Sequence, residues 1–235
     1  MSEYLVTDAD LTTVADAIRA KTGSSEQLVF PNGFSEAVNN IKTIATESYI
    51  EEQYIALSGN KYLKSAKVVG VTTIRNYLFY QQGLLEYISI PSDTVIIGQY
   101  AFYTCYSMKN INPLPDSIKY IHDKAFYNST VSALPKSLLS IGSEAFALCN
   151  NIINLHIPEN VYEIDSWAFR RCEKLTSVTF EGKQILENSH GLLSASAFNN
   201  CTNLTTINVP WAEGEVANAP WGATNATINY NYTGE

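Results

Sequence analysis

The sequence predicts an α+β repeat solenoid, in which about six short units that contain short strands follow a small N-terminal helical hairpin. Three observations carry this prediction. A phenylalanine recurs at nearly regular intervals, and a strand-like stretch that ends in proline recurs with it. Residues 1–44 instead place apolar residues at the period of amphipathic helices. Self-similarity at a roughly constant period is the sequence signature of a solenoid.

Residues 1–44 are expected to form the helical hairpin. The first helix is predicted over residues 8–21, with Asp8 or Asp10 as its N-cap and Gly23 just after its end. The second helix is predicted from about Gly33 to Ile44. Spacings of three and four residues give each helix one apolar side, formed by Leu11, Val14, Ala15 and Ile18 in the first and by Phe34, Val38 and Ile41 in the second. Residues 45–72 lack the repeat but contain alternating apolar residues, which predicts the first capping strands.

Residues 73–210 contain the repeats, with a consensus of roughly PxxVxxIxxxAFxxCxxLxxIxIP. The alternation in LxxIxIP is the period-two pattern of a short strand with one buried face, and the proline ends that strand. A single unit cannot bury its own apolar face, whereas stacked units bury each other's. We therefore expect one phenylalanine ladder through the core, at intervals of 23, 24, 20, 23 and 29 residues, formed by Phe79, Phe102, Phe126, Phe146, Phe169 and Phe198.

The longest interval and the C-terminus depart from the consensus. Residues 182–196 add about six residues between the last two phenylalanines, and insertions in solenoids map to loops on one side, so a protruding loop is predicted there. Residues 211–235 contain two tryptophans and a final alternation of Thr, Ile and Tyr, which predicts a cap closed by a hairpin or a strand.

Each of the four cysteines lies three residues after a ladder phenylalanine, at Cys105, Cys149, Cys172 and Cys201. Disulfides or a metal cluster are one interpretation of this pattern. The other is that a small, weakly polar thiol packs in a tight corner of each turn. The spacing favours structural thiols, because Ser129 interrupts the series and no CxxC or nearby histidine completes a ligand set. We predict no metal and no cofactor.

Charge and hydropathy exclude several classes of function. The net charge of -8 and the absence of a run of basic residues argue against a nucleic-acid partner. No stretch is apolar enough to predict membrane insertion, and the N-terminus does not have the pattern of a secretory signal. None of the three histidines lies in a catalytic motif, so we predict that the protein is not an enzyme.

The candidate binding residues are aromatic and occupy equivalent positions in successive repeats. Tyr77, Tyr100 and Trp167 precede their phenylalanine by two residues, and Tyr80, Tyr103 and Tyr127 follow it by one. Equivalent side chains of adjacent turns stack, so one or two aromatic stripes are expected. Tyrosine and tryptophan provide large contact areas at low entropic cost, which suits protein recognition and sugar stacking. The alternative is that the stripes shield the convex edge of the solenoid and pack against the helical cap.

The outward positions of the predicted strands form a second candidate surface. It is polar apart from Tyr87, and it includes His156, which the alternation in NLHIP directs outward. This surface is expected either to bind a partner weakly or to be hydrated, and His156 is expected to be an ordinary surface histidine.

With their AFxxCxxL and IPxxVxxI blocks, residues 74–210 resemble the BspA-like leucine-rich repeat family. The resemblance implies a right-handed solenoid with a parallel sheet on its concave side. It is less specific about function, since such repeats occur in bacterial adhesins and surface proteins that bind matrix proteins or other cells.

The two ends carry a second resemblance. LTTVADAIRAKTG followed by LVFPNGFSEAVNNI, and the C-terminal VPWAEGEVANAPWGATNATINYNYTG, are similar to segments of phage and prophage structural proteins of Gram-positive gut bacteria. This implies a tail-associated virion protein on an extracellular particle that contacts a bacterial surface. The sequence thus favours a non-enzymatic binding module whose ligand is a protein or glycan on a bacterial or host surface. A bacterial cell-surface adhesin of the BspA-like kind and a purely structural virion spacer are the alternatives.

Overall fold

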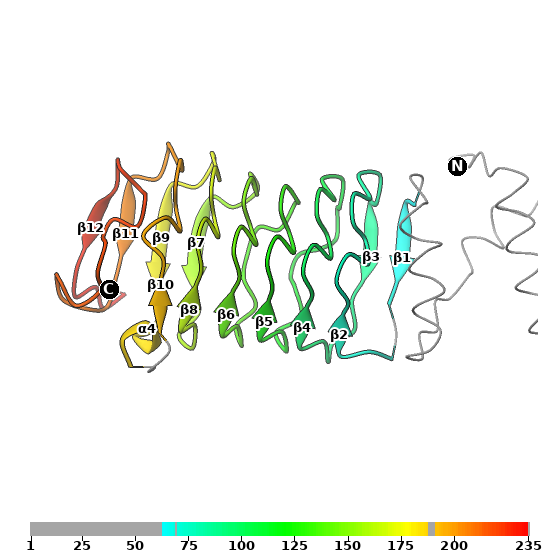
Figure 1. Cartoon of the computed structure of the whole chain (residues 1–235), viewed down its shortest axis with the longest axis horizontal. Helices are drawn as coiled ribbons and strands as arrows, with labels where there is room; N and C mark the ends of the chain where they lie inside the picture. Colours follow the sequence, from blue (N-terminus) through cyan, green and yellow to red (C-terminus); the bar gives the residue numbers. More distant parts are fainter. Residues whose placement is uncertain (1–62, 69, 188–190, 235) are drawn as a thin grey trace, which may run out of the picture. The chain divides into compact units, whose positions relative to one another are not determined.

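The computed structural model describes residues 63–68, 70–187 and 191–234. The predicted helical hairpin over residues 1–44 and most of the predicted cap strands over residues 45–72 lie outside the described residues. The described part is a parallel β-solenoid of about seven turns, whose strands lie side by side in Figure 1. The seventh turn follows Phe198 and ends in a strand, but no phenylalanine marks its corner, which is why the phenylalanine count predicts only six units.

The strands lie on two sides of the solenoid, and on each side neighbouring strands pair in parallel. One side is a six-stranded sheet of two-residue strands, each contributing one residue to the core. Its strands are β2 (Thr73–Ile74), β4 (Ile96–Ile97), β5 (Tyr120–Ile121), β6 (Ser140–Ile141), β8 (Glu163–Ile164) and β10 (Leu192–Leu193). The isoleucines five residues before the ladder phenylalanines are paired in register along this sheet.

The other side, which we call the long-strand side, is divided into two sheets. A two-stranded sheet contains β1 (Ser65–Lys67) and β3 (Tyr87–Ser89). A four-stranded sheet contains β7 (Asn154–Ile157), β9 (Ser177–Phe180), β11 (Thr206–Asn208) and β12 (Thr227–Asn229). Between β3 and β7 the chain passes this side twice without forming a strand.

The core is the predicted phenylalanine ladder, which the structure confirms. All six rings are at most 1% exposed. Each ring stacks on the next with centroids 5.1 to 5.6 Å apart and planes inclined by 1 to 14°. The backbone follows the same register: Phe102 N–H donates to the Ala125 carbonyl of the next turn at 2.7 Å, and Phe126 N–H donates to Ala145 at 2.8 Å.

The four cysteines are free and buried at the corner that follows each phenylalanine. Each thiol donates to the carbonyl of a ladder phenylalanine in the preceding turn, for example from Cys149 to Phe126 at 3.0 Å and from Cys105 to Phe79 at 2.9 Å. Burial raises the pKa of Cys149 to about 11 and that of Cys105 to about 12. These two thiols are therefore protonated donors that satisfy corner carbonyls. All four cysteines are free, which agrees with the interpretation as structural thiols.

The insertion is less of a loop than the sequence predicts. It contains α4 (Gln184–Glu187), a single helical turn, and from Leu192 the chain is back in the six-stranded sheet as β10. Both elements anchor it, because Ile185 and Leu193 are buried. The prediction of a protruding loop over the whole of residues 182–196 is therefore wrong for its C-terminal part.

The C-terminal end of the core is covered by Trp211 and Trp221, which lie in T-shaped contact with centroids 6.2 Å apart. Phe180 contacts the Trp211 ring at 5.0 Å. Both tryptophans are fully buried, and β12 adds in parallel to β11 rather than forming a hairpin. Of the two closures expected from the sequence, the structure therefore contains the strand.

Candidate functional site

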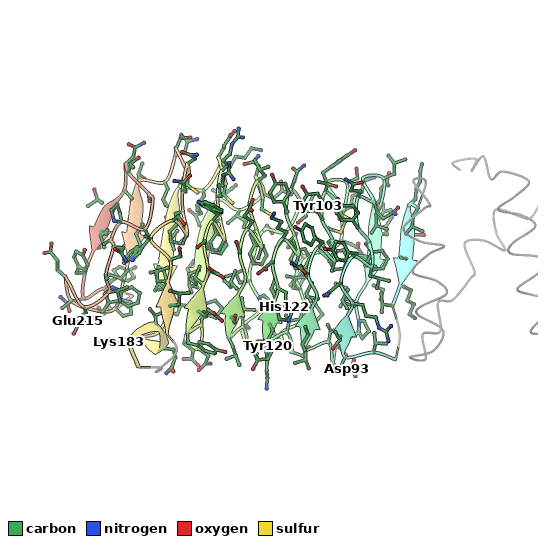
Figure 2. All side chains as sticks on the ribbon, viewed as in Figure 1. Asp93, Tyr103, Tyr120, His122, Lys183 and Glu215 are labelled. Carbon is green, nitrogen blue, oxygen red and sulfur yellow. The ribbon has the colours of Figure 1, made fainter. Side chains whose placement is uncertain are left out.

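Five tyrosines on three consecutive turns contact one another and form one aromatic surface. We call Tyr77, Tyr80, Tyr100, Tyr103 and Tyr127 the tyrosine cluster. Tyr77 and Tyr100 follow the two-residue strands and adopt positive φ angles of 62° and 56°, which turn the chain into the phenylalanine corner. The other three follow the ladder phenylalanine directly, so their side chains point away from the core. All five are half-buried, and Figure 2 labels Tyr103 within the cluster.

The tyrosine cluster consists of two stacked rows. Tyr77 and Tyr100 stack at 4.9 Å with planes inclined by 8°. In the second row Tyr103 stacks on Tyr80 at 5.2 Å and on Tyr127 at 4.7 Å. The rows contact each other edge to face, with centroids 5.7 Å apart for Tyr77 and Tyr80 and 6.1 Å apart for Tyr80 and Tyr100. The two predicted stripes therefore exist, but they merge into one surface.

The stacking decides which parts of the rings a partner can reach. Tyr103 has a ring on each face, so only its edge and its hydroxyl remain for a ligand. Partial burial raises the pKa of Tyr103, and the neighbouring Tyr127 and Tyr80 raise it further. The hydroxyl is thus a neutral group that both donates and accepts hydrogen bonds.

Trp167, which the sequence places in the same stripe as Tyr77 and Tyr100, lies outside the tyrosine cluster. The intervening turns hold Lys124 and Glu144, whose charged groups are 3.2 Å apart. Lys124 Nζ lies over the Tyr100 ring at 5.5 Å, and Arg170 lies over the Trp167 ring at 5.8 Å. Burial lowers the pKa of Lys124, but hydrogen bonds with Glu144 and Tyr100 outweigh burial and raise it. The predicted stripe is therefore interrupted by a charged pair, and Trp167 is a separate, exposed ring.

The two remaining predicted residues lie on the long-strand side. Tyr87 is 50% exposed on β3, and Lys109 Nζ lies 5.7 Å from the centroid of its ring. His156 points outward from β7, as the alternation predicts, with Nδ1 3.3 Å from Glu181 Oε1. These residues and the tyrosine cluster form no common site.

Sequence reasoning missed a break in the long-strand side next to Tyr87. The Asn110 side chain takes the place of a strand there: its Oδ1 accepts from Ile88 N–H at 2.8 Å, and its Nδ2 donates to the Ile88 carbonyl at 2.9 Å. Two residues further on, the Asn112 side chain makes similar bonds to the following turn: its Nδ2 donates to the Thr130 carbonyl, and its Oδ1 accepts from Ser132 N–H. The available signal was INPLP at residues 111–115, which replaces the IxIP of other repeats with two closely spaced prolines.

The break contains a pocket of about 220 Å³. Its lining consists of Ile88, Ser89, Ile90, Asn110, Ile111, Pro113 and Pro115. Among the described residues, no backbone hydrogen bond joins Ser89 or Ile90 to Ile111 or Asn112, whereas the strands β7, β9, β11 and β12 are paired throughout. The pocket is thus a notch between two turns, and both polar and apolar residues line it.

Comparison with known proteins shows to which family the repeats belong. A family model described as BspA type leucine rich repeat region matches residues 72–190 and 130–217, with six copies, and so covers more than half of the chain. The chain belongs to this family. Leucine-rich repeat proteins of this kind are typically non-enzymatic binding proteins. No curated protein sequence matches the chain.

Two solved structures share the leucine-rich repeat fold of this chain. A leucine rich repeat protein of T. pallidum, TpLRR, is 26% identical over 63% of this chain and 72% of its own, with a TM-score of 0.51. The pneumococcal vaccine antigen PcpA is 17% identical over 72% of this chain, with a TM-score of 0.51. This chain spans only 40% of the PcpA structure.

The described part of this leucine-rich repeat chain contains neither a metal site nor a membrane span. No group of three or more His, Cys, Asp or Glu side chains in it could hold a metal ion. No helix in the same part is long and apolar enough to cross a membrane. Within the described residues, the tyrosine cluster brings five of the predicted binding residues together on one surface.

Proposed function

We propose that this leucine-rich repeat protein is a non-enzymatic binding module and that the tyrosine cluster is its recognition surface. The observation that carries the proposal is that five half-buried tyrosines on three turns present one continuous aromatic surface. Tyrosine combines a large contact area with few rotatable bonds, and it is enriched at the residues that dominate binding energy in protein interfaces.

Closing the solenoid corner does not itself require these tyrosines. Later turns have Ala147, Arg170 and Asn199 at the position that follows the phenylalanine, and their backbone bonds and ring stacking remain regular. The tyrosines are therefore confined to three turns, although turns without them close their corners equally well. This supports a role in recognition rather than in packing alone.

The ligand best suited to the tyrosine cluster is a protein surface on a bacterial envelope. A sugar ring stacks on an open aromatic face, but the two faces of Tyr103 are covered by Tyr80 and Tyr127. At Tyr103 the ring edge and the phenolic hydroxyl remain, and these groups pack against side chains and hydrogen-bond to peptide groups. Of the two ligand classes that the sequence suggests, the stacking favours protein.

The proposed setting is the tail of a phage or prophage particle, outside the cell that produces it. The support is the resemblance of residues 11–23, 28–41 and 209–234 to segments of phage structural proteins. A bacterial cell-surface adhesin is the alternative favoured by membership in the BspA-type family. A structural virion spacer is favoured by the contacts that the tyrosines make with one another.

Binding of the fluorescently labelled full-length protein to intact Gram-positive gut bacteria tests the proposal. We expect binding that is lost when the cells are first treated with a protease, and that falls when Tyr80 and Tyr103 are replaced together by alanine. The matched control is Tyr106→Ala, which removes a 58% exposed tyrosine outside the tyrosine cluster. Binding that is equal in the double variant and the control would reject the tyrosine cluster, and protease-resistant binding would reject a protein ligand.

Immunogold labelling separates the settings. Label on the tails of particles released by induced cells would support the phage setting, whereas label on the envelope of uninfected cells would support the adhesin. A spacer would label particles but would not bind to intact cells.

A further inference from the structure

We infer that β12 is a self-association site, at which two copies of the chain pair edge to edge and antiparallel about a two-fold axis at Ile228. The pairing joins the four-stranded sheets of the two copies at their C-terminal ends. The tyrosine cluster lies in the first three turns and β12 in the last, so the inference does not depend on the function proposed for the tyrosine cluster.

The outer edge of β12 presents backbone groups to solvent. β12 is the last strand of its sheet and pairs only with β11, as Figure 1 shows. Thr227 N–H donates to the Thr205 carbonyl at 2.8 Å, and the Asn229 carbonyl accepts from Val209 N–H at 3.0 Å. Because the backbone groups of successive strand residues point to opposite sides, the N–H and the carbonyl of Ile228 point away from β11. Neither group has a backbone partner within the described part of the chain.

A residue with both backbone groups on the open edge suits a two-fold antiparallel pairing. When Ile228 lies opposite Ile228 of the second copy, the two residues exchange both N–H···O bonds. The same register places the Tyr230 N–H opposite the Ala226 carbonyl of the second copy. Among the described residues, these two groups have no backbone partner either. The open edge is therefore complementary to itself.

The outward side chains of β12 match in this register. Thr227 lies opposite Asn229 of the second copy, and the same sheet already contains such a pair, since Asn208 Nδ2 donates to Thr179 Oγ1 at 3.1 Å. Asn229 Nδ2 donates to Asn208 Oδ1 at 2.8 Å. This leaves Asn229 Oδ1, which is unpaired within the described residues, to accept from the Thr227 hydroxyl of the second copy.

The inward side chains of β12 are less buried than their equivalents in earlier turns. Ile228 is half-buried, whereas Ile207 and Val178, the paired positions of β11 and β9, are fully buried. A second copy covers Ile228 as β12 covers Ile207, and this removes apolar area from water. Ala226 and Tyr230 also pack only partly against the core. The register places the small side chain of one opposite the large side chain of the other.

The charge of the last turn favours a second copy of the chain as the occupant. Residues 216–234 contain no charged side chain, although the net charge of the chain is -8. Glu215 precedes them, and Figure 2 shows it at the lower corner of the last turn, below β12. Edge strands are commonly protected by lysine or by proline. β12 contains neither, whereas β1 contains the exposed Lys67. Two such edges can therefore approach each other without repulsion between like charges.

Sedimentation velocity of the full-length protein over a range of concentrations tests the inference. We expect a monomer–dimer equilibrium with a Kd on the order of 10 μM, as for a small interface. The mass at the highest concentration should approach twice the 26.0 kDa of one chain.

Two variants of the outward positions test the register. Thr227→Lys combined with Asn229→Lys places like charges opposite each other on both sides of the axis, and should raise the Kd by more than about tenfold. Thr227→Lys combined with Asn229→Glu places a lysine opposite a glutamate instead, and should return the Kd to within about threefold of that of the unchanged protein. Thermal melts establish that both variants remain folded.

The matched control is His156→Lys combined with Asn160→Lys. It adds the same charge at two exposed positions, on β7 and in the turn that follows it, at the other edge of the same sheet. Its Kd should equal that of the unchanged protein. Weaker dimers in this control as well would mean that net charge, and not pairing at β12, governs association.

Other results would also overturn the inference. A monomer at every concentration would exclude self-association. An unchanged Kd in the variant with two lysines on β12 would place the contact elsewhere, and a variant with lysine and glutamate that remains monomeric would reject the antiparallel register at Ile228. Species that grow beyond the dimer with concentration would indicate head-to-tail association of unlike surfaces instead of a two-fold pairing.

Discussion

The rings of Tyr103 and Tyr127 stack with their centroids 4.7 Å apart and their planes inclined by 17°. Tyr80 covers the opposite face of Tyr103 at 5.2 Å. The middle tyrosine of the row thus contributes both to the packing between turns and to the surface offered to a partner. Substitutions at this position can separate the two contributions.

Replacing Tyr103 by alanine is expected to lower the free energy of unfolding by about 1–2 kcal/mol, because two stacked contacts are lost from a half-buried position. Tyr103→Phe keeps both contacts and should change the free energy of unfolding by less than about 0.5 kcal/mol. Urea denaturation measures the stabilities, and the cell-binding assay measures recognition. If the phenylalanine variant is stable but binds less, the hydroxyl contacts the partner. Equal stability of the alanine variant and the unchanged protein would contradict the stacking.

Replacing Phe126 by alanine is expected to destabilise the solenoid by about 3–5 kcal/mol, the cost of truncating a fully buried aromatic ring. Phe126 stacks on Phe102 at 5.1 Å and on Phe146 at 5.6 Å, so the cavity interrupts the core in the middle of the ladder. Tyr106→Ala is the matched exposed control and should cost less than about 0.5 kcal/mol. A similar loss in the two variants, measured by urea denaturation, would show that the ladder does not dominate stability.

The buried thiol of Cys149 predicts a loss of stability at alkaline pH. Burial raises the pKa of Cys149 from 9.0 to about 11, so between these values the unfolded chain loses a proton that the folded chain keeps. Stability from this group is therefore complete below pH 9 and falls by about 1.4 kcal/mol per pH unit as the pH rises toward 11. Cys149→Ala should show a slope that is shallower by this amount when urea denaturation is repeated from pH 8.5 to 11. Equal slopes would contradict the burial of a protonated thiol.

Replacing Asn110 by alanine is expected to lower the free energy of unfolding by about 1–3 kcal/mol, because it leaves the buried N–H and carbonyl of Ile88 without partners. Hydrogen exchange gives a local readout, since the amide proton of Ile88 should exchange faster in the variant. Asn151→Ala is the control, because the exposed Asn151 side chain donates one bond, to the Thr130 carbonyl at 3.1 Å. Unchanged exchange at Ile88 would contradict the replacement of a strand by this side chain.

Much of the fold could be predicted because equivalent residues of successive turns contact each other. The period of Phe102 and Phe126 is sufficient to predict their stacking, and the alternation around His156 is sufficient to predict that it points outward. The same reasoning predicts the pairing of Tyr77 with Tyr100. It fails for Trp167, because a stripe is continuous only if every intervening turn has an aromatic residue, and Lys124 and Glu144 interrupt it.

At the notch, the repeat period does not predict how neighbouring turns pair. The repeat spacing places Asn110 and Ile111 at strand positions, but it does not reveal that the Asn110 amide bonds to the backbone of Ile88 in place of a strand. The replacement of a strand by the Asn110 side chain depends on the distance between two neighbouring turns. It also depends on the path of the chain through Pro113 and Pro115.

The solenoid, its phenylalanine ladder, the corner thiols and the outward direction of Tyr87 and His156 could all be predicted, because each follows from the repeat period or from the alternation of a strand. Three features became visible only in the folded chain: the two tyrosine rows join edge to face, the strand pairing stops beside Tyr87, and a seventh turn covers the core with Trp211 and Trp221. These contacts join positions that are not equivalent in the repeat. Their geometry is set by backbone angles at the corners and by side-chain hydrogen bonds between turns.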